Sequence, residues 1–299
     1  MSPASDISEE SPLAAVAEVL SCPVCGRGLV CAGRVLHCAA GHSFDIARQG
    51  YISLLTGAAT KLTGDTAAML DARAAFQGAG FFEPIAAALA HAAAAVTPSD
   101  QVAAAPEVIA DIGAGTGYYL ARVLDAVPAA RGVALDIAKP AGRRCARAHP
   151  RAAAVVADAW RGLPLRDHTL TAALSVFAPR NPAAVARCLV PGGRYLVVTP
   201  TVRHLAELIE PIGMVTVDPD KERRLAAGMA GLFTRLDTVA VEYSMTLTRG
   251  DIAHLVAMGP SAHHTAATGA ELPEPFEVTA SVTVSTYAAD PGAGSHRDG

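Results

Sequence analysis

The segment Asp111-Ile112-Gly113-Ala114-Gly115-Thr116-Gly117 decides the fold of this 299-residue chain. It closes a short apolar run, Val108–Ile112, and is followed by a helical pattern that begins at Tyr118. Glycines allow a backbone to turn tightly and to approach a ligand closely. A dinucleotide-binding loop would need glycine in place of Tyr118, and a phosphate-binding P-loop would need a Gly-Lys-Ser/Thr sequence, which this segment lacks. With Asp111 two residues before its first glycine, the loop favours a cofactor with a cationic amino-acid end over one with a pyrophosphate.

Two further acids end the strands that follow the glycine loop. Asp136 ends the next apolar run, 19 residues after Gly117, and Asp158 ends the third. The carboxyl ends of parallel strands converge on one crevice of an open α/β sheet, where an acid can accept hydrogen bonds from both hydroxyls of a ribose. Asp158 would then reach the adenine edge. A single strand-end aspartate is often only solvated or the cap of a helix, but Asp111, Asp136 and Asp158 together predict a nucleoside cofactor.

Strand-like and helix-like segments alternate after the loop. This pattern predicts parallel strands joined by right-handed crossovers, with helices on both faces of the sheet. Two longer β-rich runs near the C-terminus are expected to finish the sheet as an antiparallel pair. The predicted strands are Val108–Ile112, Gly132–Asp136, Ala154–Ala157, Thr171–Phe177, Arg194–Thr199, Val239–Thr248 and Phe276–Tyr287, and the predicted helices are Tyr118–Ala126, Ala141–Ala148 and Pro182–Leu189.

Four of the six cysteines lie between residues 22 and 38, which indicates a metal site in a reduced chain. Cys22 and Cys25 form a CxxC turn, Cys38 follows 13 residues later and His42 four residues after that. Two such pairs supply the tetrahedral ligand set that zinc takes in closed structural sites. Cys31 and His37 are the rival ligands, and reduced cysteines without metal are the alternative interpretation.

Composition and charge limit the kinds of partner. Hydrophobic residues make up 51% of the chain and charged residues 17%, with a net charge of −4. A globular fold is therefore expected, and a protein that coats nucleic acid by bulk attraction is not. No apolar run reaches the ~18 residues of a membrane span, and the acidic N-terminus is unlike a secretory signal, so we expect no membrane partner and a cytoplasmic location. Residues 21–64 hold a local positive excess, with Arg27, Arg34, Arg48 and Lys61 against Asp45.

The cysteine motif and the glycine loop together resemble those of the 23S rRNA (guanine-N1)-methyltransferase family, the RlmA group that includes macrolide-resistance members. The resemblance extends from residue 21 to about residue 210, and its zinc unit and following helix are more specific than the glycine loop. It is carried by Cys22-Pro-Val-Cys25, Cys38, Gly41-His42-Ser-Phe-Asp45, Gly50-Tyr-Ile-Ser-Leu-Leu55, Asp65-Thr-Ala-Ala-Met69, Ala72-Arg-Ala-Ala-Phe76, Asp111–Tyr119, Ala178-Pro179, Pro191-Gly-Gly193 through Thr199-Pro200, and Arg203-His204-Leu205.

With the alternating pattern, this resemblance implies an α/β fold, a Rossmann-like S-adenosylmethionine methyltransferase sheet with a small N-terminal zinc-binding domain. The expected organisation is a flexible tail (1–20) with a short helix from Leu13 to Leu20, a zinc-binding RNA-recognition domain (21–60), a helical connector (61–105), a methyltransferase domain (106–288) and a disordered tail (289–299). Breaks in the connector are expected at Gly78, Gly80 and Pro84. The zinc ligands carried over by position are Cys22, Cys25, Cys38 and His42.

S-adenosylmethionine is the implied cofactor, and zinc is implied to be structural. Positions that match the family place Phe82, Thr116, Gly117 and His204 against the cofactor. Phe82 stands where a relative can have tyrosine, and Thr116 replaces a commoner acid. The full set of expected cofactor-binding residues is Phe82, Asp111, Gly113, Gly115, Thr116, Gly117, Asp136, Asp158, Ala159 and His204.

The resemblance implies transfer of a methyl group to N1 of a guanine in a 23S rRNA hairpin, with protection from macrolides as its role. N1 carries a proton and lies on the Watson–Crick edge, so the base must be unpaired or extruded, and a general base would help. Asp158 and His204 are the candidates for that base. Phe177-Ala-Pro179 occupies the place of the Asn/Asp-Pro-Pro-Tyr motif of exocyclic-amine methyltransferases. A small-molecule methyltransferase and a non-catalytic RNA-binding protein are the alternatives, and a homodimer is considered for the assembly.

Overall fold

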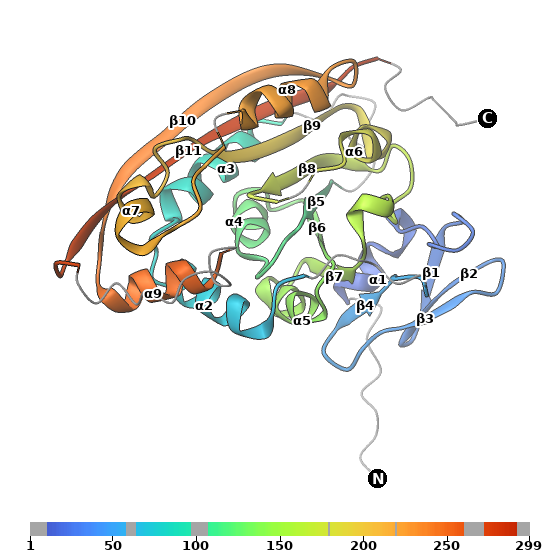
Figure 1. Ribbon diagram of the computed structural model, residues 1–299. Helices are drawn as coiled ribbons and strands as arrows, with labels where there is room; N and C mark the ends of the chain where they lie inside the picture. Colours follow the sequence, from blue (N-terminus) through green and yellow to red (C-terminus); the bar gives the residue numbers. More distant parts are fainter. Residues whose placement is uncertain are drawn as a thin grey trace, which may run out of the picture.

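The computed structural model describes residues 11–57, 64–96, 107–178, 180–218, 220–259 and 272–291. At its centre is an eight-stranded sheet with the order β10-β11-β9-β8-β5-β6-β7-β4 (Figure 1). The strands from β9 to β4 in this order are parallel, and β11 and β10 complete the sheet as the predicted antiparallel pair. The strands are β4 (Tyr51–Ser53), β5 (Val108–Ile112), β6 (Arg131–Asp136), β7 (Ala152–Val156), β8 (Leu170–Val176), β9 (Leu189–Pro200), β10 (Phe233–Leu247) and β11 (Phe276–Ala289).

Both faces of this sheet are buried, as the central strand β5 demonstrates. Ile109 packs into one hydrophobic cluster, whereas Val108 and Ile112 pack into another, because successive side chains of a strand point to opposite faces. Burial on both faces is typical of parallel strands, and the predicted fold class is confirmed. Six of the described helices contribute residues to the first cluster: α2 (Ala67–Gly78), α3 (Glu83–Ala94), α4 (Tyr118–Ala126), α5 (Lys139–Ala148), α7 (Ile209–Ile212) and α9 (Arg249–Ala257). The helices α6 (Pro182–Cys188) and α8 (Lys221–Met229) contribute residues to the second cluster.

The segment expected as a flexible tail is folded from Ser11 onward. It forms α1 (Pro12–Ala15) and the 3-10 turn η1 (Ala17–Val19), and the Ser11 side chain accepts a hydrogen bond from the backbone of Ala14. Leu13, Val16 and Leu20 follow helical spacing and are buried against the second cluster. The sequence of this stretch does not indicate the surface against which these residues pack.

The cysteine-rich unit is a small antiparallel sheet beside the large one. Its strands are β1 (Leu29–Ala32), β2 (Val35–Cys38) and β3 (Ser43–Asp45). Directly afterwards β4, which the domain prediction places within the zinc unit, pairs in parallel with β7 at the edge of the large sheet, with Tyr51 opposite Ala154. The two units therefore share a continuous core that includes Leu29 and Ile52.

The segment expected as a helical connector forms two helices, and both pack in the core. Phe76 on α2 and Ile85 and Leu89 on α3 are fully buried against the sheet. The break between these helices lies where the glycines predict it, since α2 ends at Gly78 and α3 has Pro84 in its first turn.

Several expectations concern residues that the structure does not describe. These are the first ten residues, Lys61 of the positive excess, most of the linker between α3 and β5 (97–106), Pro179 and residues 292–299. Among the described helices, none has the length and apolar character that crossing a membrane requires.

Candidate active site and metal centre

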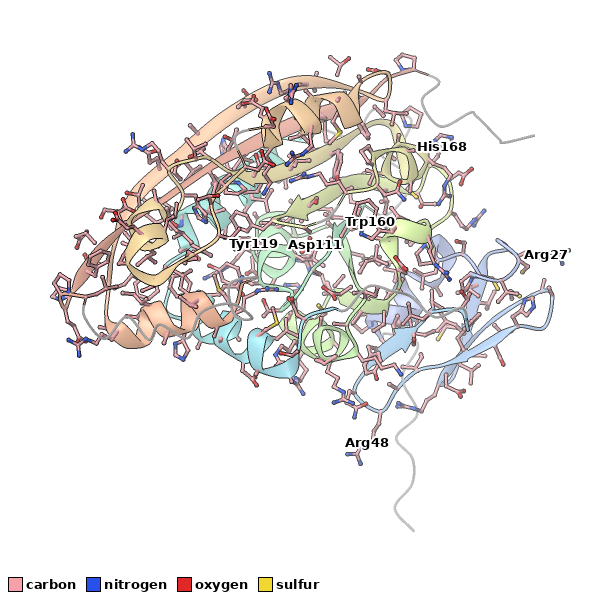
Figure 2. The ribbon with its side chains drawn as sticks, viewed as in Figure 1. Arg27, Arg48, Asp111, Tyr119, Trp160 and His168 are labelled. Carbon is pink, nitrogen blue, oxygen red and sulfur yellow. The ribbon has the colours of Figure 1, made fainter. Side chains whose placement is uncertain are left out.

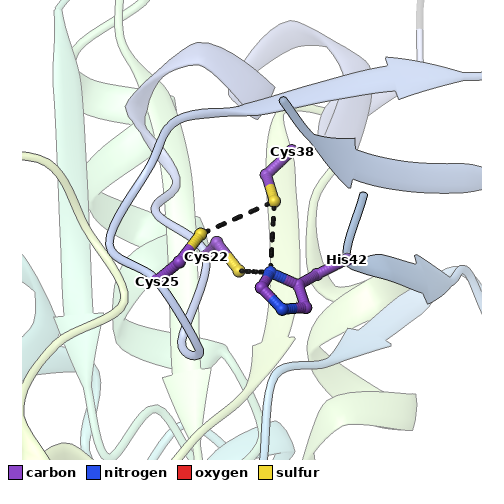
Figure 3. Close-up of side chains that lie close together, drawn as sticks. All are labelled: Cys22, Cys25, Cys38 and His42. Carbon is purple, nitrogen blue, oxygen red and sulfur yellow. Dashed lines mark hydrogen bonds between the residues drawn. The ribbon is translucent and has the colours of Figure 1, made fainter. Parts of the chain in front are cut away.

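Four side chains of the small sheet converge in the manner of a zinc site (Figure 3). The ligand atoms of Cys22, Cys25, Cys38 and His42 all lie within 4.8 Å of one another. The Sγ atoms of Cys25 and Cys38 are 3.6 Å apart, and Nδ1 of His42 lies 3.6 Å from Sγ of Cys22 and 3.4 Å from Sγ of Cys38. Zinc–sulfur bonds of about 2.3 Å in a tetrahedron place ligand atoms about 3.7 Å apart. The residues thus fit a Zn²⁺ ion with its coordination complete.

Local backbone geometry positions each pair of ligands. Gly26, with a φ of 71°, ends the first turn, and Gly41, with a φ of 85°, lets the chain reverse between Cys38 and His42. Desolvation raises the pKa of the Cys38 thiol, but hydrogen bonds from the backbone of Ala40 and His42 outweigh it and lower the pKa to about 6. A thiolate is the form that binds metal.

The rival ligands lie outside this cluster. On β2, Leu36 and Cys38 are buried, whereas His37 between them is exposed on the opposite face. Cys31 lies on the neighbouring strand, and its thiol contacts the carbonyl of Gly33 at 3.7 Å. The predicted Cys3His set, rather than either rival, is the set brought together.

The glycine loop lies at the carboxyl end of β5, where β5 leads into α4. Gly113, Gly115 and Gly117 all have positive φ values, of 79°, 56° and 80°. Asp136, at the end of β6, fixes the loop because its Oδ2 accepts the backbone N–H of Gly115 at 2.9 Å and its Oδ1 accepts that of Ala138 at 2.9 Å. At Gly117 a Cβ would lie 2.7 Å from Cβ of Ala148, so only glycine lets α4 start this close to α5.

Asp111 is a buried acid that lacks a partner. Neither carboxyl oxygen has a hydrogen bond within the described part of the chain, and the residue is 1% exposed. Burial raises the pKa of this carboxyl to about 7, and the negative charge of Asp136 adds to the rise. A buried carboxylate is costly unless a donor or cation compensates it. The ammonium group of a cofactor's amino-acid end is such a cation, and the residues present fit S-adenosylmethionine.

Aromatic rings gather beside the loop, although they come from distant parts of the chain. Phe177 follows β8 with a φ of 53°, and its ring stacks on His204 with a centroid distance of 5.6 Å and an interplanar angle of 21°. The Phe82 ring lies 6.1 Å from both, and the Tyr119 ring lies 6.4 Å from Phe177. The expected cofactor residues Phe82 and His204 thus lie in one cluster with Phe177. Their spacing in the sequence does not predict this contact with the end of β8.

His204 is held in a defined state. Its Nδ1 accepts the backbone N–H of Ser281 at 3.1 Å. Burial lowers the pKa of His204 to about 4, and the positive charge of Lys221 contributes. A neutral imidazole whose Nδ1 is an acceptor carries its proton on Nε2. At neutral pH this side chain is therefore a hydrogen-bond donor through Nε2.

Two expected site residues make contacts within the protein. The Thr116 hydroxyl donates to Oε1 of Gln77 at 2.6 Å, so it is turned toward α2. Asp158 caps the 3-10 turn η2 (Ala159–Arg161) by accepting the N–H of Trp160 at 3.0 Å. Gln77 was not among the residues predicted from the sequence. It lies seven residues after Leu70, on the apolar face of the same helix, and a polar side chain at such a position indicates a buried hydrogen-bond partner.

A groove of about 740 Å³ separates the first zinc knuckle from the carboxyl edge of the large sheet. Asp158, which follows β7 (Ala152–Val156) by two residues, lines this groove. The other lining residues used below are Arg161, Arg166 and Arg187. Trp160, which is 56% exposed, follows Asp158 (Figure 2), and Arg27 and Arg48 project from the small sheet.

The sheet order, the glycine loop at the end of β5 and the uncompensated acid beneath it define an S-adenosylmethionine-dependent methyltransferase. A family model described as "RlmA, N-terminal" matches residues 20–58, and one described as "Methyltransferase domain" matches residues 109–193. A protein of Micromonospora griseorubida named for 23S rRNA (guanine-N1) methylation is 50% identical over 90% of this chain and 96% of its own. The 23S rRNA (guanine(748)-N(1))-methyltransferase of Streptomyces fradiae is 46% identical over 90% of this chain and 96% of its own. A Bacillus subtilis relative is 30% identical over 81% of this chain and 86% of its own.

The chain therefore belongs to the 23S rRNA (guanine-N1)-methyltransferase family. This confirms the family resemblance, the zinc ribbon and the cofactor class. A more distant likeness links it to a solved S-adenosylmethionine-dependent methyltransferase of Aquifex aeolicus, which covers 61% of this chain and 82% of that chain at 12% identity and a TM-score of 0.38. The individual cofactor-binding residues and the general base stay predictions.

Proposed function

We propose that this protein transfers a methyl group from S-adenosylmethionine to N1 of a guanine in a 23S rRNA hairpin. The observation that carries the proposal is its 46% identity to the Streptomyces fradiae enzyme over 90% of the chain. The groove supports it, because one wall is the zinc ribbon and the other includes Asp158, one of the expected cofactor-binding residues. A substrate much larger than a metabolite can lie along such a path.

The residues around the loop would orient the cofactor and the base. When bound, S-adenosylmethionine supplies an electrophilic methyl group on a sulfonium, and alignment contributes much of the rate of such a displacement. Asp111 would hold the cofactor's ammonium group, and the Phe82, Phe177 and His204 cluster would exclude water from the reacting face. Sulfonium and guanine ring alike suit an aromatic surrounding.

Guanine N1 must lose its proton, and the resulting negative charge is shared with O6. Of the two candidate bases, His204 has its Nδ1 engaged by Ser281 and its proton on Nε2, so at neutral pH it suits a donor role. Such a donor in a buried site can stabilise charge that develops on O6. Asp158 then stands as the candidate base, since its carboxylate lines the groove and keeps acceptor capacity beside the N–H of Trp160 at 3.0 Å and the Arg161 guanidinium at 3.8 Å.

Arginines and an exposed indole would contact the RNA along the groove. Arg187 is paired with Asp167, whereas Arg166 donates only to the carbonyl of Glu18, at 3.2 Å, among the hydrogen bonds of the described residues. Phosphates attract such cations, and exposed aromatic rings stack on unpaired bases. Trp160 is well placed for this because its ring is exposed and its backbone N–H donates to Asp158, two residues earlier, which lines the groove.

The deciding experiment is transfer of labelled methyl from S-adenosylmethionine to 23S rRNA, free and in ribosomal subunits. We expect a single reverse-transcription stop at one guanine. Cofactor binding without transfer to any form of rRNA would instead support a small-molecule methyltransferase, and failure to bind the cofactor would support a non-catalytic RNA-binding protein.

The biological role proposed is protection of cytoplasmic ribosomes from macrolides. Expression in a sensitive host should raise macrolide tolerance, and an unchanged tolerance with a methylated guanine would refute the role but not the enzymology. We include a homodimer in the proposal, and sedimentation equilibrium of the full chain measures that assembly directly.

A further inference from the structure

Arg73 lies directly on the glycine loop. Its Nη1 is 2.8 Å from the position that a Cβ would take at Gly115, so the glycine makes room for the guanidinium. The side chain reaches this place from α2, on the same helix face as the buried Leu70 and Gln77. A positive charge on the buried face of a helix is costly unless an anion or a hydrogen-bond acceptor compensates it.

Two contacts hold this guanidinium in position. Nη1 pairs with Asp65 at 2.6 Å, and Nη2 donates to the carbonyl of Met258 at 2.8 Å. A guanidinium has five N–H donors in a planar fork, and these contacts use two of them. Donors therefore remain on a cation that is only 24% exposed and faces the loop.

The surroundings of the loop have the charge pattern of an amino-acid binding site. Asp111 lies in the strand that leads into the loop, with two oxygens that lack partners among the described residues. Tyr119, which follows the loop, is buried with a hydroxyl that likewise has none. Burial raises the pKa of Asp136, and the charge of Arg73 opposes that rise, as expected for a cation close to this crevice. Asp111, the acid that lacks a hydrogen bond among the described residues, and Arg73 match the two charges of a zwitterion.

We propose that Arg73 binds the carboxylate of the methionine end of S-adenosylmethionine, opposite in charge to Asp111, which faces its ammonium group. Arginine suits this role because its fork donates two parallel hydrogen bonds to a carboxylate. The Met258 carbonyl fixes the fork before the cofactor arrives, whereas Asp65 neutralises the guanidinium in the cofactor-free protein and competes with the carboxylate for it. The inference rests on the cofactor class and is independent of the RNA substrate.

Calorimetric titration with two ligands tests it, namely S-adenosylmethionine and its decarboxylated analogue S-adenosylmethioninamine. We expect Arg73→Gln to weaken binding of S-adenosylmethionine about tenfold or more and to leave binding of the analogue almost unchanged. Glutamine keeps a donor for the Met258 carbonyl, and circular dichroism checks that the variant is folded. Arg73→Lys, which keeps the charge but loses the fork, should fall between the two.

Asp65→Asn and Arg122→Ala are the matched controls. Asp65→Asn keeps the cation and removes its partner, so it should bind S-adenosylmethionine at least as well as the unmodified protein. Arg122 lies on α4 and pairs with Glu83 at 2.8 Å, so Arg122→Ala should change the affinity for neither ligand. Equal weakening of both ligands by Arg73→Gln, or the same loss from Asp65→Asn, would show a structural role only and overturn the proposal. Absence of binding by the unmodified protein would overturn it together with the cofactor class, and methylation of RNA plays no part in this readout.

Discussion

Replacement of Asp111 by asparagine should remove a pH dependence from cofactor binding. The carboxyl is buried without a partner among the described residues, and its pKa is raised to about 7 by burial and by Asp136. Only the ionised form attracts an ammonium group. Below pH 7 the protein must therefore lose a proton before it can bind the cofactor well, whereas Asp111→Asn has no proton to lose.

The size of the effect follows from the pKa. One pH unit below the pKa about one-tenth of the carboxyl is ionised, and one unit above it about nine-tenths is. The affinity of the unmodified protein for S-adenosylmethionine should thus rise about tenfold from pH 6 to pH 8. The ligand's own titration affects both proteins equally, so the ratio of the two dissociation constants isolates Asp111. Calorimetry in buffers of different ionisation enthalpy should also detect the released proton.

The stability of the cofactor-free protein should change in the opposite sense. Because the folded-state pKa of Asp111 lies above its ordinary value of 3.8, the folded state holds this proton more tightly than the unfolded state. The resulting stabilisation is complete below pH 3.8 and is lost as the pH rises through 7, up to about 4 kcal/mol for a shift of this size. Relative to Asp111→Asn, the melting temperature should therefore fall between pH 5 and pH 8. If the unmodified protein and Asp111→Asn showed the same pH dependence of cofactor affinity and of melting temperature, this reasoning would be refuted.

Three further predictions concern separate parts of the molecule. Cys38→Ser should release zinc and abolish methylation of rRNA while S-adenosylmethionine still binds, as measured by metal analysis and calorimetry; equal loss of cofactor binding would argue against a ribbon dedicated to RNA. Gly117→Ala should lower the melting temperature and weaken cofactor binding, because its φ of 80° and a Cβ 2.7 Å from that of Ala148 are both unfavourable; an unchanged thermal transition would contradict this. Trp160→Ala should weaken RNA binding without altering cofactor binding, and RNA should quench the fluorescence of this single tryptophan; fluorescence unmoved by saturating RNA would count against stacking.

The parts of the site that are local in sequence were predictable, and the parts built from distant contacts were not. The glycine loop, the strand-end acids and the Cys3His set each arise within a few residues or from strand order; the structure brings the four zinc ligands together and joins Asp136 to the loop. The ring stack of Phe177 on His204 depends on how β8 and the segment after β9 pack, and no spacing in the sequence encodes it. The hydrogen bond from Thr116 to Gln77 was equally unpredictable, because its acceptor lies on a helix 39 residues earlier in the sequence.

Length scale explains the misplaced boundaries as well. Leu13, Val16 and Leu20 predict a short helix, but a helix of this length gives no sign of the surface that it covers, so its place in the core could not be predicted. Three-residue β4 carries no alternation of its own, so its place beside β7 could come only from tertiary pairing.

The pairing of β4 has a mechanical consequence for the ribbon. On one side of the knuckles Leu20 bridges to Leu165, and Arg166 donates to the Glu18 carbonyl; on the other side β4 is hydrogen-bonded into the large sheet. The zinc unit is thus attached to the large sheet at both of its ends, and it cannot move away from the groove as a rigid body unless this strand pairing breaks. Zinc loss should accordingly lower the melting temperature of the whole chain while the glycine loop still binds the cofactor, and a transplant of this ribbon onto another methyltransferase would have to include both attachments.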